Sequence, residues 1–501
     1  MWKSPETSNK CLFCVAHRRK NAHLQYVNSA FCALRILTNL INVCPKTRKN
    51  GISAKSRRDD TLLTGGFSLR QRPCHVAQVP QGLHIKSTNS TFRPYGTAVT
   101  RLGLRFLPTF RPYGTLVECI RVFGQTLIIC IAGLIGIACV ESKEKEQALQ
   151  NWQFYRGDAS LSGYTDLRLP DKPVLLWTFK SEARTSSSPV IYGGTTYWCD
   201  KRGKIYGVDA NGTQSFTFDL ATAVEASPMI FDSILYIGRI DGKMSAISLA
   251  SADTLWNFET MGQISASPNR TEFGGKTAIV FGSYDNYLYC IDCSSGKQIN
   301  RYESGYYING AVALCQQSVV FGGCDAWLRI IDATEGIAGD SLLLDAYVPS
   351  SPAISGNCCY IADYSGNVYE LILDKGKIAA HKKILTSSDD NANFVSVPAV
   401  SPTMLYTVSY DRYLRATERK SGDVKWKYLL KGNTGESSPV VCRNRIIACT
   451  KTGIVSIMTA DTGELLWEFD AGEQITASPA IIQNRFFILT TKGTLFCFGK
   501  E

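Results

Sequence analysis

Short apolar runs separated by polar turns recur through residues 172–499. The runs are rich in β-branched and aromatic residues, and a turn containing Gly or Asn separates the two runs of each pair. Four examples are Ser233–Leu249 around Asp241-Gly242, Ala278–Asp292 around Asp285-Asn286, Cys359–Leu373 around Ser365-Gly366, and Ile446–Thr459 around Thr452-Gly453. Such turns between alternating runs are hairpin signals. Because no long helical pattern interrupts the series, it predicts a closed all-β array of short strands.

A Ser-Pro step precedes each of these hairpin units. Seven copies are clear, and a degenerate eighth copy is found at Gly310-Ala311. The copies lie 39 to 46 residues apart, which is about the length of one propeller blade. The clear copies are Ser188-Pro189, Ser227-Pro228, Ser267-Pro268, Ser351-Pro352, Val397-Pro398, Ser438-Pro439 and Ser478-Pro479. The repeat therefore predicts eight blades.

A third repeated element is a Gly-containing turn followed by Trp-x-aromatic. The clearest copies are Asp461–Phe469 and Ser421–Tyr428, and a weaker copy ends at Phe216-Thr217-Phe218. The Gly supplies the positive φ angle that a tight turn needs. A Trp on an outer strand has enough apolar area to hold two neighbouring blades together. We predict this structural docking role for Trp177, Trp256, Trp426 and Trp467.

This turn-and-tryptophan pattern resembles the docking motif of pyrroloquinoline-quinone-like (PQQ-like) propeller repeats. The resemblance covers roughly residues 150–499, and Trp152–Asp158 is similar to the lead-in before such repeats. Copies near Asp332–Gly336 and Lys375-Gly376 lack the Trp. The resemblance implies an all-β, eight-bladed β-propeller over residues 172–499.

The two ends of the repeat array complement each other. The last unit, Ser478–Gly499, ends without a Trp strand of its own. The strand Leu176-Trp177-Thr178-Phe179 stands before the first Ser-Pro step. Pairing this N-terminal strand with the last blade would close the ring and remove an exposed sheet edge.

Residues 1–116 differ in composition from the rest of the chain. They hold 19 Lys and Arg against three acidic residues, a net charge of +16, whereas the whole chain carries +11 and the remainder therefore −5. The basic charge thus belongs to this segment and not to the repeats, so we expect no nucleic-acid partner. We interpret residues 1–116 as a disordered or mis-called N-terminal extension. The alternative is a basic arm that binds acidic partners.

Residues 117–139 have the features of an export signal. Arg121 precedes the apolar run Leu127–Ala138, and Ile137-Ala138-Cys139 resembles the end of a bacterial lipobox. Cys139 is therefore a candidate lipidation site, and the alternative is an uncleaved anchor from Val122 to Val140. Both alternatives place the later residues outside the cytoplasm, in the periplasm or at the outer membrane. Residues 140–171 would then be a tether and lead-in.

Two adjacent cysteines, Cys358 and Cys359, are the feature that favours an enzyme. The resemblance implies this possibility, because quinoprotein dehydrogenases hold the quinone over Ca²⁺ and often carry a ring of two adjacent cysteines. We favour the alternative that the pair consists of small hydrophobic residues on the two faces of a strand. The blade spacing also leaves little room for the insertions that build a quinone pocket.

Other chemical groups in the repeats are sparse. His381 is the single histidine beyond residue 84, and Cys290-Ile291-Asp292-Cys293 is a lone CxxC where zinc sites need four ligands. Four aspartates fall at turns, where Asp is expected without a metal: Asp200, Asp241, Asp285 and Asp325. We predict no catalytic, cofactor-binding or metal-binding residue.

The sequence predicts a non-catalytic, exported, monomeric scaffold that binds other proteins. The resemblance implies kinship with the acylated propeller protein of outer-membrane β-barrel assembly, whose partners are the barrel-assembly components. That link rests on fold kinship. The alternative function is a quinoprotein dehydrogenase-like or ligand-sensing propeller.

Overall fold

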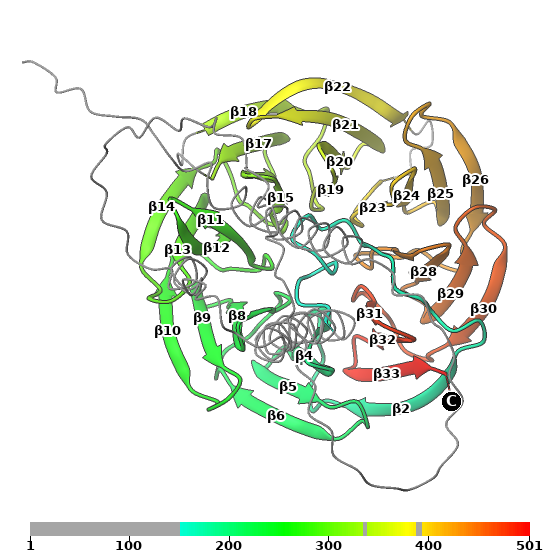
Figure 1. Cartoon of the computed structure of the whole chain (residues 1–501), viewed down its shortest axis with the longest axis horizontal. Helices are drawn as coiled ribbons and strands as arrows, with labels where there is room; N and C mark the ends of the chain where they lie inside the picture. The colour runs from blue at the N-terminus through cyan, green and yellow to red at the C-terminus, as the bar shows by residue number, and fades with distance from the viewer. Residues whose placement is uncertain (1–150, 334–337, 387–392, 501) are drawn as a thin grey trace, which may run out of the picture. The chain divides into compact units, whose positions relative to one another are not determined.

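The computed structural model describes residues 151–333, 338–386 and 393–500. These residues form 33 strands in eight small sheets, and no helix occurs among them. The sheets are arranged as blades around a central channel (Figure 1). The prediction of an eight-bladed propeller is therefore confirmed. The predictions for residues 1–116 and 117–139, including Cys139, lie outside the described residues.

Blades 1 to 4 follow one another in chain order, and in each the first strand borders the channel and the fourth forms the perimeter. Blade 1 comprises β3 (Val190–Tyr192), β4 (Thr195–Cys199), β5 (Lys204–Val208) and β6 (Gln214–Asp219). Blade 2 comprises β7 (Met229–Phe231), β8 (Ile234–Gly238), β9 (Lys243–Ser248) and β10 (Thr254–Glu259). Blade 3 comprises β11 (Asn269–Phe273), β12 (Lys276–Gly282), β13 (Tyr287–Asp292) and β14 (Gln298–Glu303). Blade 4 comprises β15 (Ala313–Cys315), β16 (Ser318–Gly322), β17 (Trp327–Asp332) and β18 (Ala338–Leu343).

Blades 5 to 7 repeat this arrangement, and blade 8 differs in its outer strand. Blade 5 comprises β19 (Ala353–Ser355), β20 (Cys358–Ala362), β21 (Asn367–Asp374) and β22 (Lys377–Thr386). Blade 6 comprises β23 (Ala399–Val400), β24 (Met404–Val408), β25 (Tyr413–Glu418) and β26 (Val424–Leu429). Blade 7 comprises β27 (Val440–Cys442), β28 (Arg445–Cys449), β29 (Ile454–Thr459) and β30 (Leu465–Asp470). Blade 8 comprises β31 (Ala480–Ile482), β32 (Arg485–Leu489), β33 (Thr494–Gly499) and, from the other end of the chain, β2 (Val174–Lys180).

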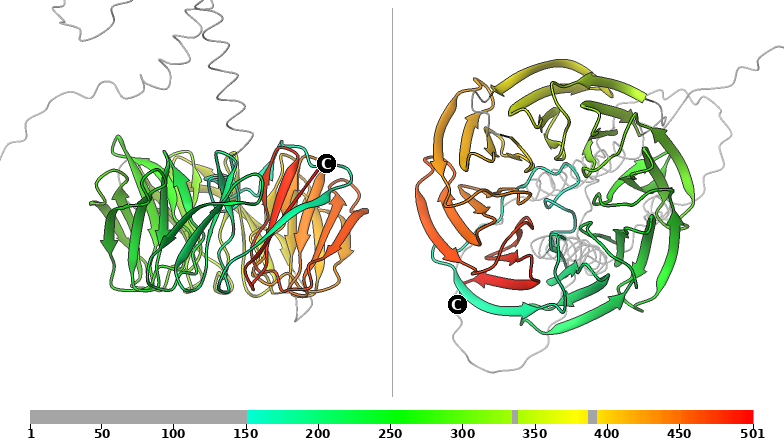
Figure 2. Two further views of the ribbon diagram at one scale, coloured as in Figure 1. Left: turned by 90° about the horizontal axis from the view of Figure 1, so that it is seen from below. Right: turned by 180° about the vertical axis from the view of Figure 1, so that it is seen from behind.

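The predicted closure of the ring is confirmed. β2 pairs with β33 in antiparallel register, with Trp177 opposite Cys497 and Thr178 opposite Phe496. A strand from the N-terminal part of the described chain therefore lies beside the last strand, and Figure 2 shows the closed ring from the side and from behind. Closure gives β33 a partner where it would otherwise be an exposed edge.

The burial of each strand follows its position in the blade. The middle strands β8 and β9 are buried at nearly every position, because neighbouring blades cover both faces of the sheet. The outer strand β10 alternates between exposed and half-buried residues, because one face meets solvent. This difference explains why the sequence shows continuous apolar runs in the middle of each unit and alternation at its end.

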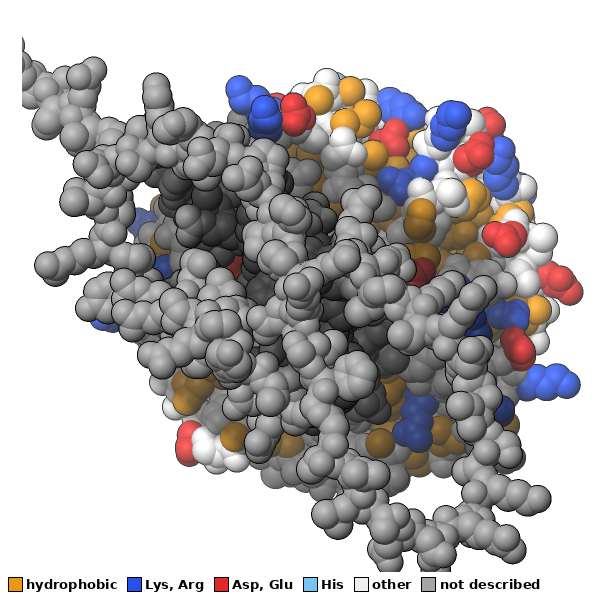
Figure 3. Space-filling model, in the orientation of Figure 1, with side chains coloured by type: hydrophobic (Ala, Val, Ile, Leu, Met, Phe, Trp, Pro, Cys, Tyr) orange, Lys and Arg blue, Asp and Glu red, His pale blue; other side chains and the backbone are white. Residues whose placement is uncertain are grey.

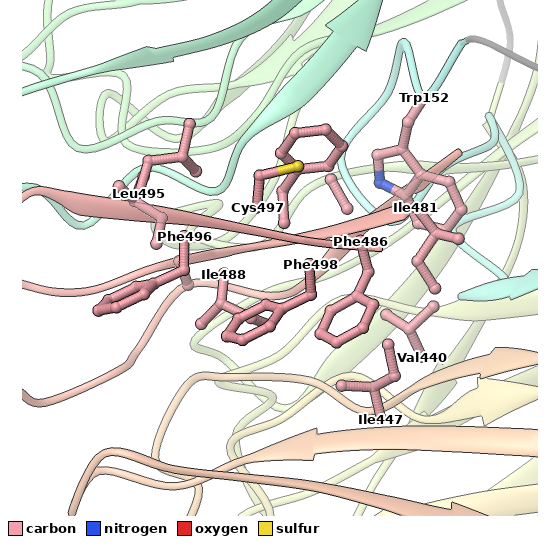
Figure 4. Close-up of a cluster of buried hydrophobic side chains, with 14 of the residues drawn as sticks. Trp152, Val440, Ile447, Ile481, Phe486, Ile488, Leu495, Phe496, Cys497 and Phe498 are labelled. Atoms are coloured by element: carbon pink, nitrogen blue, oxygen red, sulfur yellow. The ribbon is translucent and has the colours of Figure 1, made fainter. Parts of the chain in front are cut away.

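Blade 8 illustrates how side chains from one strand serve two interfaces (Figure 4). Phe496 and Phe498 of β33 point toward blade 7, where Val440 lies, whereas Leu495 and Cys497 point to the opposite face. All of these side chains belong to one buried cluster. Alternate residues of a single strand thus fill the spaces on both sides of the blade.

One detail of the predicted repeat is wrong by one residue. Ala311, and not Gly310, occupies the Ser position of the fourth step, because its N–H donates to Ser351 Oγ at 2.9 Å just as the other steps do. β15 then begins two residues later, as β7 does after Ser227. Gly and Ala are both small, so side-chain type could not fix the register here.

The perimeter carries mixed charge. Where Figure 3 leaves the perimeter uncovered, Lys and Arg side chains alternate with Asp and Glu. Pairs such as Lys425–Glu418, at 2.9 Å, are exposed, so solvent screening leaves them little effect on stability. Within residues 151–333, 338–386 and 393–500, no helix is long and apolar enough to cross a membrane.

Candidate functional site

The lead-in, residues 151–168, crosses one end of the central channel (Figures 1 and 2). Its carbonyls accept hydrogen bonds from the innermost strands of successive blades, and β1 (Tyr164–Thr165) pairs with β27. The donors and acceptors are Ile191 N to Trp152 O, Ile230 N to Gln153 O, Leu314 N to Ala159 O, Ile354 N to Ser160 O, Val400 N to Ser162 O and Val441 N to Gly163 O, at 2.8 to 3.0 Å. The lead-in therefore supplies acceptors for N–H groups of the innermost strands, which would lack protein partners if the channel were open at this end.

Arg156 of the lead-in is completely buried in the centre of the ring. Its Nη1 donates to Pro439 O at 2.6 Å and its Nη2 to Pro398 O at 2.8 Å. Burial lowers the pKa of this guanidinium to about 10, with Tyr155 and Asp158 opposing the shift. Gly163 lies against it, and a Cβ there would come within 2.0 Å of Arg156 Nη2. Arg156 thus links the lead-in to blades 6 and 7.

A ring of serine hydroxyls joins neighbouring blades around the channel. At most steps the N–H of one blade donates to the Ser Oγ of the next blade. Six such bonds occur among the described residues: Ser188 to Ser227, Ser227 to Ser267, Ala311 to Ser351, Val397 to Ser438, Ser438 to Ser478 and Ser478 to Ser188, at 2.8 to 3.1 Å. Ala311 and Val397 offer no hydroxyl, so the seams between blades 3 and 4 and between blades 5 and 6 lack this bond. We call this set the serine ring.

We expect the serine ring to contribute measurably to stability. Ser227→Ala should lower the free energy of unfolding by about 1–2 kcal/mol, because it leaves the buried Ser188 N–H without its acceptor. Ala311→Ser should raise it by up to about 1 kcal/mol by supplying the missing acceptor. Urea unfolding followed by circular dichroism measures both changes. A neutral Ser227→Ala variant would contradict this role.

The other end of the channel opens as a mouth, bordered by Lys201, Glu225 and Glu436. The cavity behind it has a volume of about 270 Å³, and Tyr155 of the lead-in contributes to its wall. Serine hydroxyls provide most of the polar lining, and Ser265 Oγ and Ser350 Oγ have no hydrogen-bond partner among the described residues. The channel is thus a blind, hydroxyl-lined funnel.

This lining does not fit a quinone held over Ca²⁺. Ca²⁺ takes about six to eight oxygen ligands with carboxylates among them, whereas Glu225 and Glu436 come from different blades. In the part of the chain that the structure describes, no group of three or more His, Cys, Asp or Glu side chains could hold a metal ion. Cys358 and Cys359 lie in β20, away from the channel lining, and burial raises the pKa of the Cys359 thiol.

The turn aspartates are used within their own turns. Asp200 Oδ1 accepts from the N–H groups of Arg202 and Lys204, and its Oδ2 accepts from Tyr206 OH at 3.0 Å. Asp285, Asp325 and Asp241 likewise bond to groups of nearby residues, namely Tyr289 OH, Arg329 and Arg239. These carboxylates therefore stabilise hairpins.

The remaining candidate groups lie far from the mouth in the fold. His381 is exposed on the outer strand β22, opposite Leu371. Cys293 Sγ contacts Tyr236 OH at 2.6 Å, and Cys290 is buried in β13. The CxxC segment is therefore packed into blade 3 and its interface with blade 2.

Three of the four predicted docking tryptophans make the same contact. Each lies on an outer strand and donates its Nε1–H to a carbonyl in a turn of the next blade at 3.0 Å: Trp177 to Ala210, Trp256 to Cys293, and Trp426 to Ala460. A glycine of that turn lies under each ring, and a Cβ there would approach ring atoms to 2.9, 2.6 and 2.5 Å at Gly212, Gly296 and Gly463. We propose that these contacts fasten neighbouring blades.

Trp467 makes a different contact. It packs against Phe486 and Phe498 with centroid distances of 5.9 and 5.2 Å. Its neighbour is blade 8, where β33 and β2 come from opposite ends of the chain and no hairpin joins them. The turn that receives the other tryptophans is therefore missing at this position.

Sequence reasoning missed the residues that surround the mouth. In all eight blades, one residue of the turn after the second strand donates its N–H to a carbonyl of the linker that enters the blade, at 2.7 to 3.2 Å. The turn residues are Lys201, Ile240, Tyr284, Cys324, Tyr364, Tyr410, Lys451 and Thr491, and their linker partners are Arg184, Ala223, Gln263, Tyr307, Tyr347, Asn393, Asn433 and Gln474. A sequence alignment of the eight repeats, anchored on this turn, would have placed these equivalent positions in the same columns.

These positions and the residues directly beside them differ sharply around the ring. Blades 3 to 6 carry the aromatic arc, which we define as Tyr284, Tyr306, Tyr307, Tyr347, Tyr364 and Tyr410. Blades 7, 8 and 1 carry the basic arc, which we define as Lys451, Lys492, Arg184 and Arg202. The mouth thus has one aromatic side and one basic side.

Comparison with known proteins agrees with this architecture. The sequence profile of the outer membrane protein assembly factor BamB matches residues 171–379 and 325–501. A BamB of Legionella pneumophila (strain Paris) is 28% identical over 169 residues, which are 34% of this chain and 41% of that relative. The aligned part therefore spans less than half of the relative's length.

Solved structures show the same fold. BamB from Moraxella catarrhalis superposes with a TM-score of 0.56 at 16% identity, covering 66% of this chain and 98% of that chain. The quinohemoprotein alcohol dehydrogenase from Comamonas testosteroni superposes with a TM-score of 0.57 at 13% identity, covering 70% and 81%. At such identities the likeness shows the fold alone, whereas the profile match spans the whole propeller. The chain therefore belongs to the family of the outer membrane protein assembly factor BamB.

Proposed function

We propose that this chain is a non-catalytic, extracytoplasmic scaffold that binds proteins during outer-membrane β-barrel assembly. The observation that carries the proposal is the family match over residues 171–501, a family whose named members are assembly factors. The lead-in closes one end of the channel, and serine hydroxyls line the rest. Both features support a binding role over a catalytic one. The mouth offers the contact surface, and the propeller acts as a monomer.

Affinity purification from a bacterium that encodes this chain tests the proposal. A tag after Glu501 lies beyond the last strand and leaves the mouth free. We expect the barrel-assembly channel to copurify after mild crosslinking, and an equally expressed tagged periplasmic protein should not retain it. A preparation that contains the intact propeller but none of the assembly components would contradict the proposal.

The fold similarity to quinoprotein dehydrogenases favours a second candidate function. We expect no dye-linked oxidation of alcohols or sugars when the purified chain is incubated with pyrroloquinoline quinone and Ca²⁺, because the channel lining lacks a suitable donor set. Quinone-dependent turnover would replace the scaffold proposal with an enzymatic one.

We further propose that Cys139 is acylated and anchors the protein to a membrane. Cys139→Ser should move the protein from the membrane fraction to the soluble periplasmic fraction, because the thiol that carries the lipid is gone. Fractionation and metabolic labelling with a fatty acid measure this. Ala138→Ser leaves the thiol in place and serves as the control. Full retention of Cys139→Ser in the membrane would instead favour the uncleaved anchor over Val122–Val140.

A further inference from the structure

The aromatic arc and the basic arc occupy positions where the fold does not determine the type of side chain. The structural contact at or directly beside each position is a backbone hydrogen bond that all eight blades make with different side chains; Tyr306, Arg202 and Lys492 are the neighbours of residues that make it. Blade 2 makes it with Ile240 and Ala223, and blade 8 with Thr491 and Gln474. The concentration of tyrosine in four consecutive blades therefore needs another explanation than propeller geometry.

The tyrosines form two stacked pairs, and each pair has one exposed member and one partly buried member. Tyr284 stacks on Tyr307 with ring centroids 5.1 Å apart, and Tyr347 stacks on Tyr364 with centroids 4.6 Å apart. Tyr306, Tyr307, Tyr347 and Tyr410 remain 36–47% exposed. Exposed aromatic groups in a contiguous set mark interaction sites, and tyrosine combines apolar area with low entropy cost on binding.

Paired aromatic rings suit one kind of peptide in particular. Proline-rich segments adopt the polyproline II conformation before binding, and they dock into grooves lined by aromatic side chains. Their prolines fit between rings and lack N–H groups that would need partners. The aromatic arc therefore favours an extended proline-rich segment.

The basic arc indicates the charge of the binding partner. Lys451, Lys492, Arg184 and Arg202 form no ion pair with any residue that the structure describes, and three of them, Lys492, Arg184 and Arg202, are exposed. On the aromatic side, by contrast, Asp325 and Asp411 are paired with Arg329 and Arg415. Glu436 at the mouth also has no ion-pair partner among the described residues, so four unpaired positive groups face one unpaired negative group on this side. The net charge of that side is therefore positive, which attracts an acidic partner.

We propose that the mouth binds an extended polypeptide that has a proline-rich part for the aromatic arc and an acidic part for the basic arc. This inference rests on the proposed function and names the chemistry of the partner. The two parts bind opposite sides of one ring, so a single segment crosses the channel opening. Its affinity falls with ionic strength, because the acidic part contributes through screened charges.

Fluorescence anisotropy on the purified chain tests this inference. The probe is a fluorescein-labelled dodecapeptide of six glutamates followed by six prolines. We expect saturable binding that weakens at least tenfold when alanines replace the prolines or lysines replace the glutamates. Equal binding of all three peptides, or no binding of the first, would overturn the inference.

Matched variants locate the site. The double variants Tyr307→Ser/Tyr347→Ser and Lys492→Glu/Arg202→Glu should each weaken binding at least tenfold. Leu343→Ser and Lys377→Glu place comparable changes on the exposed outer strands β18 and β22 and should leave binding unchanged. Circular dichroism identifies a variant that fails to fold, and the single variants Tyr347→Ser and Lys492→Glu then replace it. Binding that survives loss of both arcs would show that the peptide binds elsewhere.

The same variants separate the two proposals. If the peptide binds through both arcs but no assembly component copurifies, the proposed function fails and the mouth chemistry stands. If assembly components copurify equally with a variant that lacks both arcs, the proposed function stands and the inference falls.

Discussion

Arg156→Met is expected to lower the free energy of unfolding by about 3 kcal/mol. The guanidinium makes two hydrogen bonds to the carbonyls of Pro398 and Pro439, and bonds to a charged group contribute about 1.5–3 kcal/mol each. Removing the charge also removes the cost of burying it, so the net loss is smaller than the sum of both bonds. Methionine leaves both carbonyls without these donors in the same buried space. Urea unfolding followed by circular dichroism measures the loss.

Arg168→Met is the matched control for this prediction. Arg168 belongs to the same lead-in, but its side chain is exposed and has no bonding partner among the described residues. Its replacement should change stability by less than about 0.5 kcal/mol. Arg156→Lys should fall between the two, because one ammonium group lacks the planar fork that reaches both carbonyls. If Arg156→Met matched the control, the lead-in would not be fastened by this residue.

The global fold was accessible from sequence because its signals repeat. The Ser-Pro steps and the turn glycines recur at one spacing, so an error in one copy leaves the blade count unchanged. The fourth step shows this, since the shift from Gly310 to Ala311 did not alter the prediction of eight blades. Closure was accessible because a strand that contains Trp177 preceded the first step and the last unit lacked one.

The lead-in was recognised by resemblance, but its role was not. It satisfies the inner strands with backbone carbonyls, which no side-chain pattern encodes. Arg156 is the exception, yet a single arginine in a polar segment gives no sign that it will be completely buried. Its partners are carbonyls of Pro398 and Pro439, more than 200 residues away in sequence.

The two arcs were missed for a different reason. Their residues lie at or beside the backbone hydrogen bond that all eight turns share and outside the repeat motif, so their side chains differ from blade to blade. Tyr284 and Tyr307 come from neighbouring blades, and their rings stack only once those blades pack together. The tyrosines belong to blades 3 to 6, whereas Lys492 and Arg202 belong to blades 8 and 1. The proposed peptide site therefore depends on differences between copies, whereas the fold depends on what the copies share.

Gly463→Ala is expected to lower the free energy of unfolding by about 2–4 kcal/mol. Gly463 has a φ of +72°, and a Cβ there would lie 2.5 Å from the ring of Trp426. The left-handed backbone costs an alanine about 1 kcal/mol, and forcing the ring away costs about 1–3 kcal/mol more. A displaced ring also loses its hydrogen bond to Ala460 O. Urea unfolding measures the total.

Gly472→Ala separates the backbone cost from the clash. Gly472 has nearly the same φ, +65°, but nothing lies within 4 Å of its Cβ position, so only about 1 kcal/mol should be lost. In a Trp426→Ala background no indole ring is present for the new Cβ to clash with. Gly463→Ala should then lower the free energy of unfolding by no more than Gly472→Ala does. Equal losses for the two glycines in the natural background would mean that Trp426 does not press on this turn. The tryptophan would then be a perimeter residue that covers its own blade, and the other contacts between blades 6 and 7, among them the serine ring and Arg156, would hold them together.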